Sequence, residues 1–234
     1  IKTLGDYAFS DCTSLKSAVI KPVGSIGSYV FNRCTALEEL TLPYAGSSLT
    51  AVNNTDSSGR VASRLFNNNV SDKTYYDEWS YYIPNSLKKI TITGGTRIPS
   101  YAFSGFKGVT EFVLPEGITS IGNYAFYNCE SLPSNPMPST VKVIGSHAYD
   151  GCKSLKVFTV PSSVETIGSY AFANCTGFTS ITVPKTIKTL GDYAFENCTS
   201  LKSAVIKPVG SIGSCVFNRC TVLEELTLPY AGQS

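Results

Sequence analysis

The sequence has few of the residues on which catalytic and nucleic-acid-binding sites depend. Its 234 residues include one histidine, one methionine and one tryptophan, and charged residues make up only 15% of the chain. The formal net charge is +2 and the basic residues form no run, so nothing attracts nucleic acid electrostatically. No apolar stretch approaches the roughly 18 residues of a membrane span. We therefore expect neither nucleic-acid binding nor membrane insertion.

Motifs of nucleophilic catalysis, phosphate binding and metal binding are also missing. There is no Gly-x-Ser-x-Gly elbow, no phosphate loop ending in Lys-Ser/Thr, and no Cys-x-x-Cys pair. His147 stands five residues before Cys152, a separation that a catalytic pair could have. Both residues, however, occupy regular positions of the repeat described next. We therefore predict no catalytic residues, no metal site, no cofactor and no enzymatic activity.

What the sequence does contain is a passage of 22 to 23 residues that recurs along the chain. Most copies read Ile/Leu-Gly-x-Tyr-Ala, then an aromatic residue, a Cys three residues later, and a Leu-x-x-apolar-x-apolar-Pro segment. A fixed period of this length indicates stacked units, none of which can bury its apolar face alone. The aromatic column consists of Phe9, Phe31, Phe66, Phe103, Phe126, Tyr149, Phe172, Phe195 and Phe217.

Seven of the eight cysteines share one column of the repeat. In stacked turns their side chains run parallel, which is the wrong geometry for a disulfide, so we predict buried and unbridged thiols. A tyrosine column lies two residues before the aromatic one, and His147 and Cys215 replace Tyr in it. Repeat position alone therefore accounts for His147. The cysteine column consists of Cys12, Cys34, Cys129, Cys152, Cys175, Cys198 and Cys220.

The alternation in the Leu-x-x-apolar-x-apolar segments predicts short parallel strands. The residues on either side of the middle apolar position should point away from the core. The Ile-Gly segment predicts a second extended piece, and Tyr-Ala-Phe-x-x-Cys predicts a single helical turn. Prolines in LPSNPMP at 132–138 predict weaker strand pairing there. Strands are expected near residues 18–20, 40–42, 90–92, 112–114, 158–160, 181–183, 204–206 and 226–228.

The repeat IGxYAFxxCxxLxxxxIP resembles the BspA-like subclass of leucine-rich repeats, and the resemblance covers nearly the whole chain. It implies a right-handed leucine-rich-repeat solenoid, with short parallel strands on the concave face and turns or short helical turns on the other side. It also implies a secreted or cell-surface location on a host-associated microbe, because several members of the family are adhesins. The sequence departs from the family pattern in the expanded repeats at 47–84 and in the prolines at 132–138.

The chain is expected to form one solenoid of nine units over residues 1–234. Residues 1–46 and 187–232 are nearly identical and differ only at Ser10/Glu196, Asp11/Asn197, Tyr29/Cys215 and Ala36/Val222. This identity indicates a recent duplication within a longer parent chain. Neither end reads as a polar cap, which exposed terminal repeats need for solubility. Self-association through uncapped ends is therefore one expectation.

The expanded repeats carry the most distinctive cluster of side chains. Tyr and Trp favour binding surfaces because they offer large amphipathic area with few rotatable bonds. The alternative is that these rings fold back over a widened core. Because insertions in repeats often gather on the binding face, we expect any partner to touch this loop and the adjoining sheet. The expected partner-binding residues are Tyr75, Tyr76, Trp79, Tyr81, Tyr82, Lys89, Thr91 and Glu111.

Three functions fit these observations. The first is a protein-binding solenoid, part of an adhesin that engages a host extracellular protein. The second is a structural stalk or self-associating surface array without a dedicated ligand. The third is carbohydrate binding, with sugar rings stacked on the aromatic loop at 75–82. Four Asn positions also match the glycosylation acceptor pattern, namely Asn53, Asn69, Asn174 and Asn197.

Overall fold

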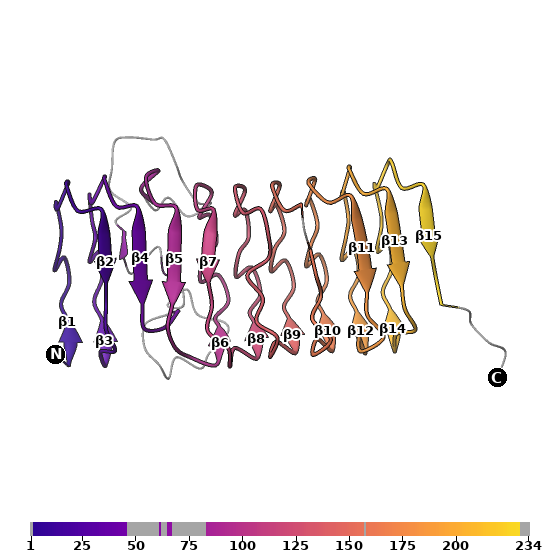
Figure 1. The fold of residues 1–234 in the computed structure, drawn as a ribbon, viewed down its shortest axis with the longest axis horizontal. Coiled ribbons are helices and arrows are strands. Elements are labelled where there is room, and N and C mark those ends of the chain that lie inside the picture. Colours follow the sequence, from indigo (N-terminus) through magenta and orange to yellow (C-terminus); the bar gives the residue numbers. More distant parts are fainter. Residues whose placement is uncertain (1, 46–60, 62–64, 67–82, 157, 230–234) are drawn as a thin grey trace.

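A computed structural model shows the repeats stacked side by side along the long axis of the molecule (Figure 1). It describes residues 2–45, 61, 65–66, 83–156 and 158–229. Their strands form two parallel ladders. The first ladder contains β2 (Ser17–Val19), β4 (Glu39–Leu42), β5 (Lys89–Ile92), β7 (Glu111–Val113), β11 (Ser180–Val183), β13 (Ser203–Ile206) and β15 (Glu225–Thr227). The second contains β1 (Thr3–Leu4), β3 (Ser25–Ile26), β6 (Arg97–Ile98), β8 (Ser120–Ile121), β9 (Val143–Ile144), β10 (Thr166–Ile167), β12 (Thr189–Leu190) and β14 (Ser211–Ile212).

These ladders confirm a parallel-strand solenoid of the leucine-rich-repeat class. The first ladder comprises the sheets β2-β4-β5-β7 and β11-β13-β15, and the second comprises β1-β3 and β6-β8-β9-β10-β12-β14. Within each ladder, equivalent residues of successive turns pair, as Ser203 pairs with Glu225 and Thr189 with Ser211. Seven of the eight predicted strands are present within a residue or two, and the Ile-Gly segment forms the second ladder as expected.

The missing strand is the one predicted at 158–160, and the proline-rich segment lies one turn before it. Among the described strands, none connects β7 to β11. The first ladder is therefore divided into two sheets at this point. Proline has no N–H to donate to a ladder, which is the physical reason for the division. The side chain of Asn135 connects these two turns where the strand pairing is missing. Its Nδ2 donates to the Thr159 carbonyl at 3.3 Å, and its Oδ1 accepts from the Thr159 N–H at 3.5 Å.

In most described repeats the Tyr-Ala-Phe-x-x-Cys segment forms consecutive hydrogen-bonded turns in place of the predicted single helical turn, whereas Val61 and Leu65, just before Phe66, are helical. Residues of the tyrosine column have a positive φ, for example 56° at Tyr124 and 54° at His147. A second residue four positions later, such as Asn128, also has a positive φ (55°). Left-handed backbone at two points of each segment cannot continue a right-handed helical turn. The chain instead folds back sharply toward the next strand.

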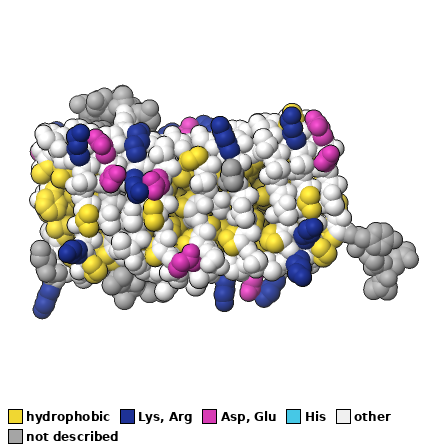
Figure 2. Space-filling view, viewed as in Figure 1, with side chains coloured by type: hydrophobic (Ala, Val, Ile, Leu, Met, Phe, Trp, Pro, Cys, Tyr) yellow, Lys and Arg dark blue, Asp and Glu magenta, His cyan; other side chains and the backbone are white. Residues whose placement is uncertain are grey.

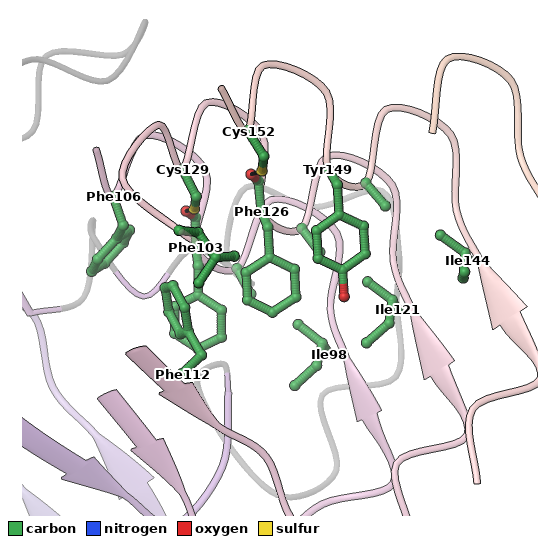
Figure 3. Packing of buried hydrophobic residues seen from close by; sticks show 14 of the residues in the cluster. Ile98, Phe103, Phe106, Phe112, Ile121, Phe126, Cys129, Ile144, Tyr149 and Cys152 are labelled. Atoms are coloured by element: carbon green, nitrogen blue, oxygen red, sulfur yellow. Dashed lines mark hydrogen bonds between the residues drawn. The ribbon is translucent and has the colours of Figure 1, made fainter. Parts of the chain in front are cut away.

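The core is built around the aromatic column (Figure 3). From Phe103 to Phe217 the rings stack turn upon turn with centroids 5.1–5.6 Å apart. Tyr149 is the one tyrosine in this column, and its hydroxyl is fully buried without a hydrogen-bond partner. The leucines and isoleucines of both ladders close around these rings. Each turn therefore buries its apolar residues against its neighbours.

The cysteine column is unbridged, and its interior members are buried as predicted. Every thiol of the column except Cys12 donates to the carbonyl oxygen of the aromatic residue one turn earlier, as Cys152 Sγ does to Phe126 at 3.3 Å. Burial raises the pKa of the Cys129, Cys152 and Cys175 thiols well above the usual range. The prediction of burial is wrong for Cys12, which is exposed because it lies in the first turn of this chain.

Successive turns approach so closely at the recurring Ile-Gly step that only glycine fits. A Cβ on Gly122 would lie 2.5 Å from the backbone nitrogen of Ser100 in the preceding turn. At some junctions an Asp or Asn next to this step also ties the turns together. Asn123 Oδ1, for example, accepts the backbone N–H of Ser146 at 2.9 Å. The close approach therefore brings backbone and side-chain hydrogen bonds into register from turn to turn.

Candidate functional site

The outward surface of the first ladder consists of rows of side chains that cross the strands. In β4 and β7 the middle residue is buried while its neighbours on both sides are partly or fully exposed, as predicted. Charged side chains of both signs gather on the N-terminal half of this face, over β4, β5 and β7 (Figure 2). On β11 and β13 the corresponding residues are Ser, Thr and Val. Charges of both signs therefore lie together over β4, β5 and β7, are absent from the outward positions of β11 and β13, and recur as the exposed Glu225 on β15 (Glu225–Thr227).

A shallow depression of about 470 Å³ lies within this charged area. We call it the charged hollow, and it is lined by Glu38, Glu39, Ser86, Lys88, Lys89, Thr110 and Glu111. Three strands contribute to it because Glu39, Lys89 and Glu111 are paired in register across β4, β5 and β7. Two of the three described residues predicted to bind a partner, Lys89 and Glu111, therefore lie in one depression. Thr91 lies two residues further along β5 and is half-buried.

Hydrogen bonds hold the side chains of the charged hollow in place. Lys89 Nζ lies 2.8 Å from Glu111 Oε1, and this hydrogen bond raises the pKa of Lys89. Lys88 Nζ donates to the Gly108 carbonyl at 3.2 Å. Ser86 Oγ donates to the carbonyls of residues 35 and 37, at 2.9 and 2.7 Å. The hollow can thus offer both ammonium donors and carboxylate acceptors to a polar partner.

The remaining predicted partner-binding residues, Tyr75, Tyr76, Trp79, Tyr81 and Tyr82, lie outside the described residues. The structure therefore places only the sheet component of the predicted site. The described residues on either side of residues 67–82 are part of the solenoid core. Leu65 is buried and its carbonyl accepts from the Phe31 N–H at 2.8 Å, and Ile83 is also buried.

The rings of the tyrosine column stack on one another. The sequence predicted that these residues share a column but did not predict that their rings stack. Tyr101, Tyr124, His147, Tyr170 and Tyr193 stack face to face at 4.5–4.8 Å with interplanar angles of 2–6°. Because both faces of each inner ring are covered by neighbouring rings, these rings cannot act as flat platforms for sugars. Their half-buried position and stacking indicate a structural role.

His147 takes part in this stack and does not form a catalytic pair. Its Nδ1 lies 2.8 Å from Asp150 Oδ2, and the other carboxylate oxygen accepts from Asn174 Nδ2 at 2.8 Å. The Cys152 thiol is fully buried and donates to the Phe126 carbonyl. A nucleophilic cysteine needs a lowered pKa and access to substrate, whereas burial raises the pKa of Cys152. The interpretation of His147 as a repeat residue is therefore consistent with its surroundings.

Two of the four candidate glycosylation positions have side chains that are already engaged. Asn174 Nδ2 donates to Asp150, and Asn197 Nδ2 donates to Asn174 Oδ1 at 2.8 Å. Both residues also have a φ of 55° within the tight turns. The amide nitrogen that would be modified is thus part of a hydrogen-bonded network between turns. Asn53 and Asn69 lie outside the described residues.

The described part of the chain contains neither a cluster of metal ligands nor a membrane-spanning helix. Across that part, no group of three or more His, Cys, Asp or Glu residues could hold a metal ion. The same residues contain no helix with the length and apolar character needed to cross a bilayer.

Comparison with known proteins identifies the repeat. The family model described as "BspA type Leucine rich repeat region (6 copies)" matches residues 2–133, 78–202 and 142–233. A leucine-rich repeat protein of T. pallidum is 28% identical, with a TM-score of 0.57, and the match covers 61% of this chain and 70% of that one. Comparison with curated proteins finds no significant match.

Two further solved structures share the fold. A leucine-rich cell surface protein of Faecalibacterium prausnitzii is 22% identical, with a TM-score of 0.50, and the match covers 100% of this chain and 70% of that one. A leucine-rich repeat protein of Bacteroides ovatus is 22% identical, with a TM-score of 0.55. That match covers 93% of this chain but only 46% of the Bacteroides protein.

Proposed function

Since this chain belongs to the BspA type leucine-rich repeat family, we propose that it is a secreted or surface-displayed solenoid that binds a host extracellular protein without catalysing a reaction. The observation that carries the proposal is the charged hollow, where hydrogen-bonded charges of both signs from three neighbouring strands line one depression. A leucine-rich cell surface protein among the solved structures supports the surface location.

The shape and chemistry of the charged hollow favour a protein partner. It is open and shallow and spans three strands, so it suits an extended or convex surface better than a small enclosed ligand. Complementary charges across an interface contribute mainly specificity and association rate. The aromatic loop at 75–82 precedes β5 in the chain and supplies Trp79 and four tyrosines as candidate anchors. We propose that the loop and the hollow form one continuous binding surface.

The proposal is tested by measuring binding of the chain to a panel of purified serum and extracellular-matrix proteins. The first variant exchanges the charges of the hollow, Lys89→Glu with Glu111→Lys. This exchange keeps the net charge and the ion pair but inverts the local field. A matched control exchanges a pair of similar geometry just before strands β10 and β12 of the second ladder, Glu165→Lys with Lys188→Glu, whose side chains are 2.7 Å apart.

We expect the exchange in the charged hollow to weaken binding about tenfold or more, and the control exchange to leave it unchanged. Trp79→Ala tests the loop separately, because loss of a central aromatic anchor costs a binder about 2 kcal/mol or more. Equal binding by both exchange variants would exclude the hollow as the site. If no host protein binds the unaltered chain, the adhesin function is wrong and a structural array becomes the better explanation.

A further inference from the structure

The first ladder has a second depression, which lies beside β7 where the ladder divides. Its volume is about 270 Å³. The proline-rich segment at 132–138 follows β7 in the place of a strand, and no described strand pairs with β7 on that side. We call this surface the proline depression. It is lined by Phe112, Val113 and Leu114 from β7 and the residue after it, and by Pro136, Met137 and Pro138 from the next turn.

The floor of the proline depression is apolar and open to solvent. Val113 is 39% exposed, and in the described part of residues 20–211 the only other exposed large apolar side chain is Val143, in β9 of the second ladder. At the outward positions that match Val113, β5 and β11 carry Thr91 and Thr182. Hydrophobic side chains are visible on this face beyond the charges over β4, β5 and β7 (Figure 2). The depression therefore exposes apolar surface where two other strands of the ladder carry threonine.

Two carboxylates flank this apolar floor along the chain. Glu111 lies two residues before Val113, lines the charged hollow and is held by Lys89 at 2.8 Å. Glu116 lies three residues after Val113 and lines the depression, where its Oε2 accepts from Ser139 Oγ at 3.0 Å. Among the described residues, no lysine or arginine forms an ion pair with Glu116. The rim of the depression therefore carries negative charge that a cationic partner can neutralise.

The size of the depression and the spacing of these groups indicate what can bind. Ligand pockets usually enclose about 300–1,000 Å³, so an open depression of about 270 Å³ suits a single side chain of a larger partner. In an extended chain, side chains on one face recur about every 6.6 Å. Glu111 and Val113 have this same spacing because they are alternate residues of β7. A segment laid along β7 can therefore place a cationic side chain at Glu111 and an apolar one in the depression.

We propose that the proline depression binds an apolar side chain from an extended, basic polypeptide segment. The segment carries cationic residues on both sides of its apolar residue, and these face Glu111 and Glu116. The prolines break the ladder pairing of the repeat, and such departures from local rules are expected at functional sites. Because β7 contributes Glu111 to the charged hollow and Val113 to the depression, the two surfaces are continuous. The inference rests on the proposed function, since it takes the partner to be a protein.

Met137 makes the depression directly observable. It is the one methionine of the chain, so methyl-¹³C-methionine labelling gives a single resonance from the wall of the depression. The probe is a capped pentapeptide of sequence RTLTR. Two control peptides are used, of which RTSTR lacks the apolar side chain and ETLTE carries the opposite charge.

We expect RTLTR to shift the methyl resonance of Met137 with a Kd of about 1 mM or below. Both control peptides should bind at least tenfold more weakly, because one loses the buried apolar side chain and the other meets carboxylates of like charge. No shift at about 5 mM RTLTR, or equal affinity for the three peptides, overturns the proposal.

Variants of the protein identify the surface. Val113→Lys places a charge in the depression and should weaken RTLTR binding at least tenfold. Val205→Lys is the matched control, because Val205 is half-buried at the matching position of β13, in the other sheet of the ladder, and it should leave binding unchanged. Circular dichroism confirms that each variant is folded. Equal binding by the two variants would rule out the depression.

A charge reversal at the rim gives a readout that misfolding cannot imitate. Glu116→Lys should weaken RTLTR binding and strengthen ETLTE binding, each by about two- to fivefold, because the exposed rim changes sign. Affinity changes in the same direction for both peptides would contradict the proposed role of the rim.

Failure of this inference and failure of the proposed function give different results. If a host protein binds the unaltered chain and the Val113→Lys variant equally, and RTLTR leaves the Met137 resonance unshifted, the depression is excluded while the proposed function stands. If RTLTR binds selectively but no host protein of the panel binds, the adhesin function is wrong and the depression remains a peptide-binding site.

Discussion

The first turn and its copy at residues 187–210 have nearly the same sequence but very different surroundings. They differ only at Ser10/Glu196 and Asp11/Asn197. Phe9 is nonetheless 43% exposed, whereas Phe195 is fully buried. Cys12 is exposed and Cys198 is buried. Because the local sequences are nearly the same, the difference comes from the turn that precedes residues 187–210 and packs on them, for which the given sequence has no counterpart before residue 1.

This comparison shows that residues of a solenoid are buried by the contact between neighbouring turns. An apolar residue of the repeat becomes a core residue only when turns pack on both of its sides. Stability should therefore depend on the position of a turn in the stack as much as on its sequence. Four predictions test this dependence.

The largest expected effect is that of removing a ring from the aromatic column. Phe195→Ala should lower the free energy of unfolding by about 3–5 kcal/mol, because it removes a fully buried ring between two stacked neighbours. Phe9→Ala should lower it by about 1–2 kcal/mol, since much of that ring already contacts water. Urea unfolding followed by circular dichroism measures both. Equal losses would show that the surroundings of the two turns do not govern their contribution.

The buried thiols predict a loss of stability at alkaline pH. Burial raises the pKa of Cys129, Cys152 and Cys175 in the folded chain above the value of about 8.5 for an unfolded thiol. These buried, protonated thiols therefore contribute fully to the stability of the fold below about pH 8.5. That contribution is lost as the pH rises toward the folded pKa, because the unfolded thiols ionise first. In that pH window, each of the three thiols should lower the free energy of unfolding by about 1.4 kcal/mol per pH unit. The three together should lower it by roughly 4 kcal/mol per pH unit.

Unfolding free energies measured at pH 7.5, 8.5 and 9.5 under reducing conditions give this slope. Replacing Cys129, Cys152 and Cys175 by alanine should make the slope shallower, whatever the variant loses at neutral pH through packing, and the buried Cys34 and Cys198 account for part of the slope that remains. Cys12→Ala is the matched control, because that thiol is exposed and should leave the slope unchanged. A slope that is the same in all three proteins would contradict the assignment.

The division of the first ladder predicts a smaller effect. Asn135→Ala removes both side-chain hydrogen bonds to Thr159 and should lower the free energy of unfolding by about 1 kcal/mol. Asn135→Asp retains the acceptor but not the Nδ2 donor, so it should lose about half as much. Hydrogen exchange of the Thr159 amide provides a local measurement. Protection that is unchanged in the alanine variant would mean that backbone contacts alone join these turns.

The smallest expected effect, and one of opposite sign, concerns Tyr149. Its hydroxyl is buried without a partner, while six described residues at equivalent buried positions, including Phe126 and Phe172, are phenylalanine. Tyr149→Phe should therefore leave stability unchanged or raise it by up to about 1 kcal/mol. Thermal unfolding measures the shift. A clear loss of stability would indicate that the hydroxyl has a partner, such as a buried water.

Much of the fold could be predicted from the period of the sequence. The columns of Phe, Cys, Tyr and Gly, and the alternation in the Leu-x-x-apolar-x-apolar segments, identified the solenoid, the parallel strands and the outward rows that contain Lys89 and Glu111. The period of the sequence did not show that most Tyr-Ala-Phe-x-x-Cys segments lack a helical turn, because a short apolar segment does not reveal the sign of φ. The stacking of Tyr124 on His147 was also not evident, since a column in the sequence does not specify ring orientation.

The sequence by itself determined which residues share a column, because a repeat that cannot bury its apolar face alone must stack in register with its neighbours. It also determined where ladder hydrogen bonds fail, since the prolines at 132–138 lack the N–H group that a ladder requires. Only the tertiary structure decided which members of a column are buried. Phe9 and Phe195 have nearly the same local sequence, and Phe195 is a core residue because a neighbouring turn packs on both of its sides.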